Sequence, residues 1–143
     1  MNDILFKLVD ELRAEIKSNY EKQNLVASGR FGNELKTVNK GGSIAIVAPH
    51  YAVQMILGRR SGKRPPVKAI KQWIKDKNRN AGTNIPEDAA YAIAKKIGDE
   101  SIRVPNHYNN GTAIKSVITD DRVKRLIDDM LNVTKAQILN ILK

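Results

Sequence analysis

The side chains in this sequence best suited to chemistry are the basic residues gathered between Gly58 and Arg79. That stretch holds nine Lys and Arg residues against one acidic residue, Asp76, so it supplies +8 of the chain's net charge of +10. Concentrated positive charge binds anions, here nucleic acid, an acidic protein surface or a membrane surface. A solvated face without a dedicated partner is the simpler alternative. The residues expected to make the contact are Arg59, Arg60, Lys63, Arg64, Lys68, Lys71 and Lys75.

The loop from Gly58 to Arg64 invites comparison with the phosphate-binding P-loop, but it lacks that motif's defining features. Its glycines are one residue too close together, Arg64 stands where a Ser or Thr would hold Mg²⁺, and the loop follows an expected helix instead of a strand. If the loop contacts DNA, we expect contacts to phosphates that are independent of sequence and steeply sensitive to salt.

No pattern in the sequence indicates a catalytic or metal site. His50 and His107 are the only histidines, and neither has a close-spaced acid or a second histidine. The acidic pairs 120–121 and 128–129 point in different directions on a helix, and no serine has a local nucleophile signature. We therefore predict a protein that is not an enzyme and that holds no metal and no cofactor.

Trp73 is the one aromatic residue inside the basic stretch. It could stack on a base, but the spacing of Ile70 and Ile74 places it beside an apolar helix face. We therefore favour core packing for Trp73. The lysines of the same helix form a cationic stripe on another face.

The elements that must position these side chains indicate one α+β domain spanning residues 1–143. An amphipathic helix is expected over 3–22, packed on its own domain in preference to a neighbouring subunit. A β-hairpin is expected over 31–48, turning at Asn39–Gly42. A two-stranded hairpin alone is only marginally stable, so the hairpin must pack on helices or join a larger sheet.

Residues 51–77 are predicted to form a short helix, the basic loop and the helix of Trp73, with a loop at 78–83. The next helix is expected over 84–97, capped by Thr83 or Asn84, with Pro86 in its first turn and Gly98 stopping it.

The polar loop 101–111 is more typical of a contact surface than of a plain connection. From 119 to 142 the chain is predicted to be helical, either as one helix or as two, with Thr134 capping the second. The apolar residues of the final turns, Ile138, Leu139 and Leu142, are expected to face inward.

Composition excludes several classes of protein. There is no cysteine, hence no disulfide framework and no thiolate metal site. Acidic residues within the first helix argue against a signal peptide, and no apolar run approaches the roughly 18 residues of a transmembrane helix. We therefore expect a protein that does not enter a membrane.

Several segments, in their order, are similar to neck and tail-completion proteins of tailed bacteriophages. The longest runs from Tyr51 to Lys77 and contains Tyr-Ala, a short apolar stretch, Gly-Arg, then Pro-Pro and a helix with Trp. Ala90–Ile97 resembles the alanine-rich helix that follows in that family, and Val104–Asn106 with Asn109–Gly111 resembles the next segment. Upstream, the Ser-Gly-Arg-Phe run at 28–31 and the hairpin are similar too.

The resemblance covers about residues 25–118 and rests on the order of its pieces, because no single piece is specific. Members often carry an acidic residue immediately before the Gly-Arg pair, where this chain has Leu57. That departure weakens any transfer of one particular subunit contact. The last 25 residues match nothing in the family.

The resemblance implies a non-enzymatic virion subunit that forms a homo-oligomeric ring at the portal–tail joint, after residing in the host cytoplasm during assembly. The ring would contact the portal and other neck or tail proteins. The basic residues would face either packaged DNA, without sequence preference, or an acidic face of a neighbouring ring protein. Phe31, Tyr51, His107 and Tyr108 are the residues expected at contacts with subunits or partner proteins.

Other functions remain as alternatives. The first is a free-standing nucleic-acid-binding protein without sequence preference, whose affinity would fall steeply as salt rises. A membrane-surface protein would need a basic polar face on an amphipathic helix, but the first helix has mixed charge. A virion-associated enzyme would need a convergent polar pocket, which no sequence pattern indicates.

Overall fold

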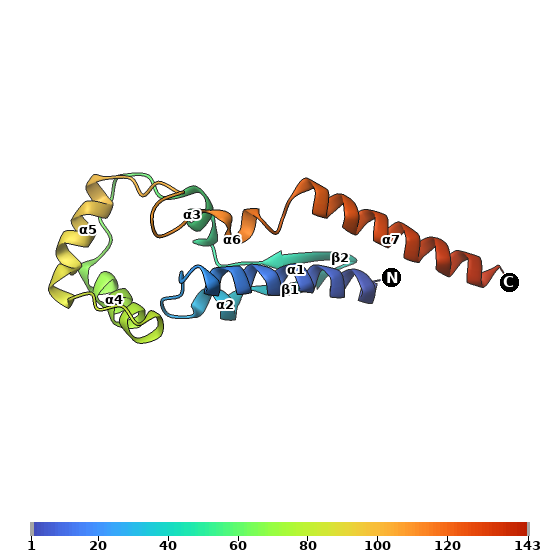
Figure 1. Ribbon diagram of the computed structural model, residues 1–143, viewed down its shortest axis with the longest axis horizontal. Coiled ribbons are helices and arrows are strands. Elements are labelled where there is room, and N and C mark those ends of the chain that lie inside the picture. The colour runs from blue at the N-terminus through green and yellow to red at the C-terminus, as the bar shows by residue number, and fades with distance from the viewer. Residues whose placement is uncertain (1, 143) are drawn as a thin grey trace.

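The computed structural model describes residues 2–142, with side chains from 3 to 142, as an elongated molecule (Figure 1). Helices accompany one two-stranded antiparallel sheet among these residues, which confirms the predicted α+β class. The elements in chain order are α1 (Asn2–Lys22), α2 (Arg30–Glu34), β1 (Lys36–Lys40), β2 (Ser43–Val47), α3 (Ala52–Leu57), α4 (Val67–Ala81), the 3₁₀ turn η1 (Glu87–Ala89), α5 (Ala90–Asp99), α6 (Thr112–Lys115) and α7 (Asp120–Ile141).

Helix α1 lies along the hairpin and builds the first hydrophobic cluster with its C-terminal half. Ile16 and Tyr20, four residues apart on one face, are buried there. The helix therefore packs on its own chain, as its periodicity predicts. The other buried members of the cluster come from α2, the residue after it, α3 and the turn after α6: Phe31, Leu35, Ala52 and Val117.

The hairpin begins later than the sequence indicates, because residues 30–34 form the short helix α2. Phe31 and Leu35 are both buried, and a spacing of four places them on one side of a helical turn, whereas in the expected strand the exposed Asn33 would share their face. The Phe31 ring packs on Tyr20, with ring centroids 4.5 Å apart. The prediction of a strand from residue 31 was therefore wrong.

The strands themselves pair in register from Lys36 opposite Val47 to Lys40 opposite Ser43. Only Gly41 and Gly42 lie between the last pair, and both have positive φ angles, 58° and 94°. Two consecutive left-handed residues make the tight turn whose twist matches that of the flanking strands. The predicted turn is confirmed, although it is two residues shorter than expected.

A second hydrophobic cluster lies at the far end of the molecule, where α4 packs against η1 and α5 (Figure 1). Ile70 and Ile74 from α4 meet Ala90 and Ala94 from α5, and these small residues let the two helix axes approach closely. No buried residue belongs to both clusters.

The boundaries of these two helices differ from those predicted. Helix α4 continues to Ala81 and ends at Gly82, which is left-handed. The Asn78 side chain, expected in a loop, instead closes the connection: its Oδ1 accepts hydrogen bonds from the Ile85 amide and the Thr83 hydroxyl, and its Nδ2 donates to the Ile85 carbonyl. Thr83 is thus engaged by α4 and does not cap the following helix.

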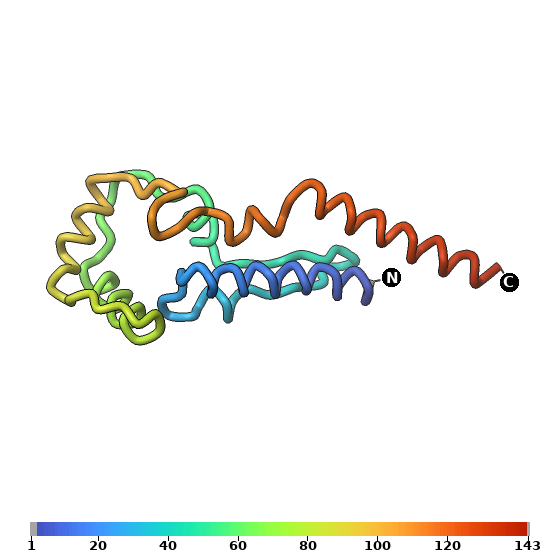
Figure 2. Tube along the Cα trace, in the orientation of Figure 1, coloured from blue at the N-terminus to red at the C-terminus, as the bar shows by residue number. Residues whose placement is uncertain are grey.

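Figure 2 shows that two short segments, 58–66 and 100–111, carry the chain between the two clusters. They touch through an antiparallel bridge between Arg59 and Ile102. A second tie joins the end of α4 to the loop after α1, because the Lys77 ammonium donates to the carbonyls of Asn24 and Val26. Burial lowers the pKa of Lys77 at this junction.

Helix α7 runs as one element from Asp120 to Ile141 and projects past the N-terminal end of α1 (Figure 1). Thr119 caps it by accepting a hydrogen bond from the Arg122 amide at 3.4 Å, and Thr134 lies inside the helix, where its hydroxyl donates to the Met130 carbonyl. No residue of α7 is buried. The expectation that its final apolar side chains face inward was wrong: Ile138, Leu139 and Leu142 are all more than half exposed.

A substitution in the second cluster should act on that cluster alone. Ile74 is 0% exposed, so Ile74→Ala leaves a cavity and should lower the free energy of unfolding by about 2–5 kcal/mol. Hydrogen exchange should accelerate in α4 and α5 while α1 and the hairpin keep their protection, since the clusters share no buried residue. Uniform acceleration across the chain would show instead that the two clusters unfold as one unit.

Stability at high pH should depend on Tyr20. Burial raises the pKa of its hydroxyl to about 12 from an ordinary 10.0. Between these values the unfolded chain releases the proton and the folded chain keeps it, so stability falls as pH rises. Tyr20→Phe should therefore lose less stability than the unmodified chain in urea unfolding between about pH 10 and 12. Tyr108→Phe is the matched control for removing a tyrosine hydroxyl, and equal pH slopes for all three proteins would contradict the argument.

Candidate anion-binding surface

The basic loop 58–64 is held in a fixed path by the segment that leaves α5. The amides of Arg59 and Ile102 each donate to the other's carbonyl at 2.8 Å. Three residues on, the Gly62 amide donates to the Gly98 carbonyl at 2.9 Å. The loop is therefore pinned at two points by backbone hydrogen bonds, which do not depend on which basic side chains it carries.

Two glycines permit this close contact. Gly58 has φ 79° and ψ −166°, a region that only glycine adopts readily, and a Cβ there would lie 2.0 Å from the Ile102 carbonyl oxygen. Gly98 is buried inside α5, and a Cβ there would lie 2.2 Å from Cγ of Arg64 and 3.1 Å from its Cα. Gly98 was expected to stop the helix; its role is instead to give the basic loop room to pass.

Some of the predicted contact residues are engaged within the chain. The Arg59 guanidinium donates to the Lys63 carbonyl at 2.7 Å and braces the loop from inside. Arg64 binds Asp99 with 2.9 Å between Nη2 and Oδ1, and this hydrogen bond raises the pKa of Arg64. Lys75 lies 3.6 Å from the Glu87 carboxylate. All three side chains remain partly exposed, so they contribute to the positive electrostatic potential of this surface. Their charged groups nevertheless already bind acceptors within the chain.

The remaining four predicted residues, Arg60, Lys63, Lys68 and Lys71, are exposed. Among the described residues, none of their charged groups has an ion-pair partner. Two lie on the pinned loop and two on the first turns of α4. These four cations form what we call the cationic face: they are the members of the predicted contact set that can meet an external anion without first breaking an internal ion pair.

The fold also adds a cation that sequence reasoning missed. A shallow groove beside the loop is lined by Arg59, Arg60 and Arg103, with Leu57 and Ile102 among its apolar residues. Arg103 enters this set because the Arg59–Ile102 bridge brings its segment alongside the loop. No spacing along the chain connects Arg103 to Arg59, so only the tertiary structure reveals it.

Trp73 does not lie in the core as expected, since 39% of its surface is exposed. On α4 it flanks the buried Ile70 and Ile74 on the side away from the Lys68 and Lys71 stripe. Its exposed ring therefore lies apart from the cationic face.

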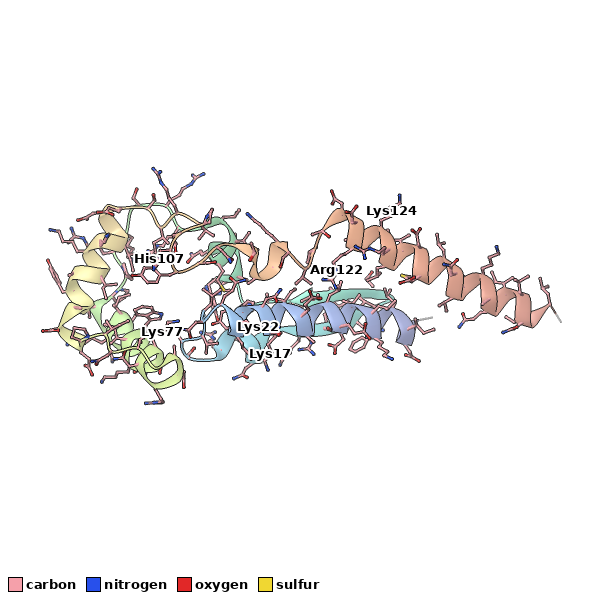
Figure 3. The ribbon with its side chains drawn as sticks, in the orientation of Figure 1. Lys17, Lys22, Lys77, His107, Arg122 and Lys124 are labelled. Atoms are coloured by element: carbon pink, nitrogen blue, oxygen red, sulfur yellow. The ribbon has the colours of Figure 1, made fainter. Side chains whose placement is uncertain are left out.

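The four residues expected at contacts with other proteins have different environments. Phe31 is 1% exposed and belongs to the core, so its assignment to an interface was wrong; an aromatic ring in a short helix packs inward. Tyr51 is partly buried against the first cluster. His107 and Tyr108 are exposed, Tyr108 by 84%, with their rings 5.1 Å apart at an edge-to-face angle. Figure 3 labels His107 on the connecting segment between the two clusters.

The loop that carries this pair is ordered by asparagine side chains. Asn106 Oδ1 accepts hydrogen bonds from the amides of Tyr108 and Asn109, and Asn109 Nδ2 donates to the Met55 carbonyl at 2.9 Å. Such turns present the aromatic pair to solvent in a defined position. Both side chains are exposed, and their role as a contact surface stays a prediction.

Within the described residues, no three His, Cys, Asp or Glu side chains gather as a metal site would need. His50 and His107 are both exposed. No described helix combines the length and apolar character that crossing a bilayer requires.

The fixed path of the loop should be lost when a side chain is added at its first glycine, Gly58. Gly58→Ala should cost about 1–3 kcal/mol from backbone strain, and the clash with the Ile102 carbonyl should break the bridge to Arg59. Urea unfolding measures the first effect, and faster hydrogen exchange at the Ile102 amide measures the second. Ser61→Ala, an exposed change in the same loop, is the control. An Ile102 amide that stays protected in Gly58→Ala would show that the loop is held by something else.

Comparison of the chain with protein-family models, with curated protein sequences and with solved structures gives no match. The function must therefore be argued from the geometry of the chain itself.

Proposed function

We propose that this chain is a non-enzymatic structural subunit of a tailed bacteriophage. In this proposal it forms a homo-oligomeric ring at the joint between portal and tail, with the cationic face directed at the DNA that passes through. The observation that carries the proposal is the cationic face itself: Arg60, Lys63, Lys68 and Lys71 have no internal ion-pair partner and stand on a loop and helix that backbone contacts hold rigid.

A rigid display of charge suits contact with a polyanion of regular form. The phosphates of duplex DNA repeat at short intervals, so cations carried on a pinned backbone meet them without reordering that backbone. A ring of identical subunits repeats such a display around the duplex. Contacts of this kind hold and guide DNA without selecting a sequence.

The segments that resemble the phage family are also neighbours in space. Tyr51–Lys77 covers α3, the basic loop and most of α4, and Ala90–Ile97 lies on α5, which packs on α4. The Val104–Asn106 turn follows the strand bridge to Arg59. These three pieces of the resemblance therefore lie together, whereas the 28–31 run and the hairpin belong to the first cluster.

The exposed apolar surface supports a subunit over a free-standing nucleic-acid-binding protein. Leu57 is 69% exposed at the groove beside the basic loop, Tyr91 is 62% exposed on α5, and the loop pair His107 and Tyr108 stands in solvent. Val53, Leu57 and Ile102 are exposed together along that groove. A contiguous apolar patch of this kind is typical of a surface that a neighbouring protein covers.

The cationic face should account for contact with DNA but not for assembly. The variant Arg60→Ser, Lys63→Ser, Lys68→Ser, Lys71→Ser removes four unpaired cations and should lower the slope of log affinity against log salt by about 3–4. Binding to random-sequence duplex DNA, measured from about 50 to 300 mM KCl, gives the slope. Rings formed with the portal protein of the same phage, imaged by negative stain, should persist, because the internal contacts of Arg59, Arg64 and Lys75 are retained.

The matched control removes four other exposed lysines, Lys7, Lys36, Lys40 and Lys115, which lie on α1, the hairpin and α6. It should keep the salt slope of the unmodified chain. Two results would count against the proposal: equal slopes for both four-site variants, or tight DNA binding by a chain that forms no ring with the portal. The second result would favour the free-standing nucleic-acid-binding protein.

A further inference from the structure

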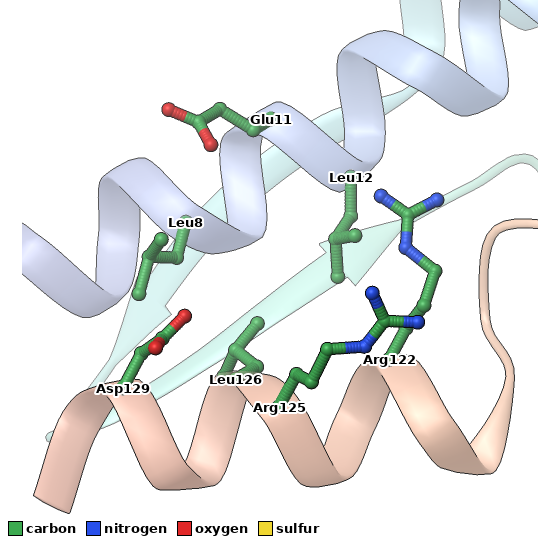
Figure 4. Close-up of a pocket in the computed structure, with 7 residues that line it drawn as sticks. All are labelled: Leu8, Glu11, Leu12, Arg122, Arg125, Leu126 and Asp129. Atoms are coloured by element: carbon green, nitrogen blue, oxygen red, sulfur yellow. The ribbon is translucent and has the colours of Figure 1, made fainter.

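Helix α7 presents its most apolar stripe away from the rest of the chain. Its side toward α1 carries Arg122, Arg125, Leu126 and Asp129, which line a shallow groove with α1 (Figure 4). The Arg122 guanidinium there lies 2.7 Å from the Glu15 carboxylate and lowers the pKa of Glu15. The stripe lies on the opposite side of the helix. Its residues follow one another at alternating spacings of four and three: Ile127, Leu131, Thr134, Ile138 and Ile141.

The four aliphatic side chains of this stripe are exposed, by 49% at Ile127, 62% at Leu131, 53% at Ile138 and 82% at Ile141. A helix in water gains most of its stability from packing its apolar face, and α7 buries no residue within the chain. Its C-terminal half extends past α1 with nothing beside it (Figure 1). The stripe therefore needs a cover from outside the chain.

We propose that this cover is α7 of a second copy of the chain, packed antiparallel across a two-fold axis. A repeat of alternating four and three residues is the pattern by which two helices interlock side chains along a seam. In the antiparallel arrangement Ile127 meets Ile138 of the second copy, and Leu131 meets Thr134 of the second copy. The two-fold axis repeats both layers, so the apolar part of the stripe is covered on both copies.

The charges beside the stripe select a second copy and the antiparallel direction. Asp128 and Lys135 lie on the same flank, each directly after a residue of the stripe. Antiparallel packing places Asp128 beside Lys135 of the second copy, and the two-fold axis generates the reciprocal pair. The opposite flank carries Met130 and Gln137, so it introduces no like charges.

Parallel packing in register lacks this complementarity. It would place Lys124 opposite Lys124 of the second copy at the start of the seam and would leave Asp128 and Lys135 without opposite charges across it. In the antiparallel pair Lys124 lies near Ile141 of the second copy, where its aliphatic stem covers apolar surface and its ammonium reaches solvent.

This contact is separate from the ring proposed above. A two-fold contact uses the same surface on both copies and pairs two chains, so it cannot by itself close a larger ring. Lateral contacts within a ring must use other surfaces. The paired state is thus a property of the free chain. The test of pairing is independent of the test of the proposed role at the portal–tail joint.

Sedimentation of the free chain tests the pairing. The unmodified protein should sediment with twice the 16.0 kDa mass of one chain. Leu131→Asp, at an exposed position, should leave the helical circular dichroism of the body intact and sediment as a single chain. Asn132→Asp adds the same charge one residue away, off the stripe, and should sediment as a pair. A single-chain mass for the unmodified protein, or equal masses for the two variants, would overturn the proposal.

Cross-linking and charge exchange test the direction. The chain has no cysteine, so a mixture of Ile127→Cys protein with Ile138→Cys protein should form the mixed disulfide under mild oxidation, and neither variant alone should link to itself. Asp128→Lys alone should weaken the pair by placing like charges together, and adding Lys135→Asp should restore it. Self-linking of Ile127→Cys would indicate parallel helices and refute the antiparallel arrangement, as would a double exchange that fails to restore pairing.

Discussion

The backbone contact between the segments that join the two hydrophobic clusters determines where everything else in the molecule lies. Residues 58–62 run against 98–102 with hydrogen bonds at both ends of the contact, and glycines at 58 and 98 remove the Cβ atoms that would prevent it. Because no buried residue is shared between the clusters, this contact and the Lys77 tie to the loop after α1 set how the α4–α5 pair stands on the rest of the chain. The candidate site is built on that same contact.

Electrostatics then divide the basic residues into two groups. Arg59, Arg64 and Lys75 bind acceptors within the chain and stabilise the path of the loop and of α4. The two ion pairs, of Arg64 and Lys75, are exposed and contribute little to stability, so the main effect of these contacts is to hold geometry. The residues of the cationic face have no ion-pair partner in the described part of the chain and can bind an external anion. The net charge of +10 therefore does not by itself show which cations a partner can reach.

The apolar surface shows a similar division. Side chains of α1, α2 and α3 are buried in the first cluster, and α4 and α5 supply the second, whereas α7 contributes to neither. It is tied to the body by its first turns, through Arg122 and Glu15, and leaves the body with its apolar stripe outward. The side of α7 that lines the groove with α1 carries charged residues, and the exposed apolar stripe on the other side is the basis of the pair proposed above.

Much of the element content could be predicted from the sequence, because periodicity and turn residues are local. The α1 stripe, the Gly41-Gly42 turn, the α4 face of Ile70 and Ile74 and the long helix after Thr119 all follow from spacing. The failures were at places where distant residues decide. Residues 30–34 form a helical turn whose Phe31 packs on Tyr20, and Gly98 lies inside α5 where Arg64 passes over it. At Asn78 the deciding contacts are nearer, with residues 83 and 85, but they are side-chain hydrogen bonds that periodicity does not reveal.

The candidate site divides in the same way. The sequence by itself determined that positive charge is concentrated in 58–79, that it stands on a glycine-punctuated loop and an amphipathic helix, and that α+β elements surround it. Only the tertiary structure decided which cations are free, that Arg103 joins them, that Phe31 is buried and that the α7 stripe faces outward. The reason is physical: charge and helical spacing are properties of neighbours along the chain, whereas pairing and burial depend on which distant residues the fold brings within a few ångströms.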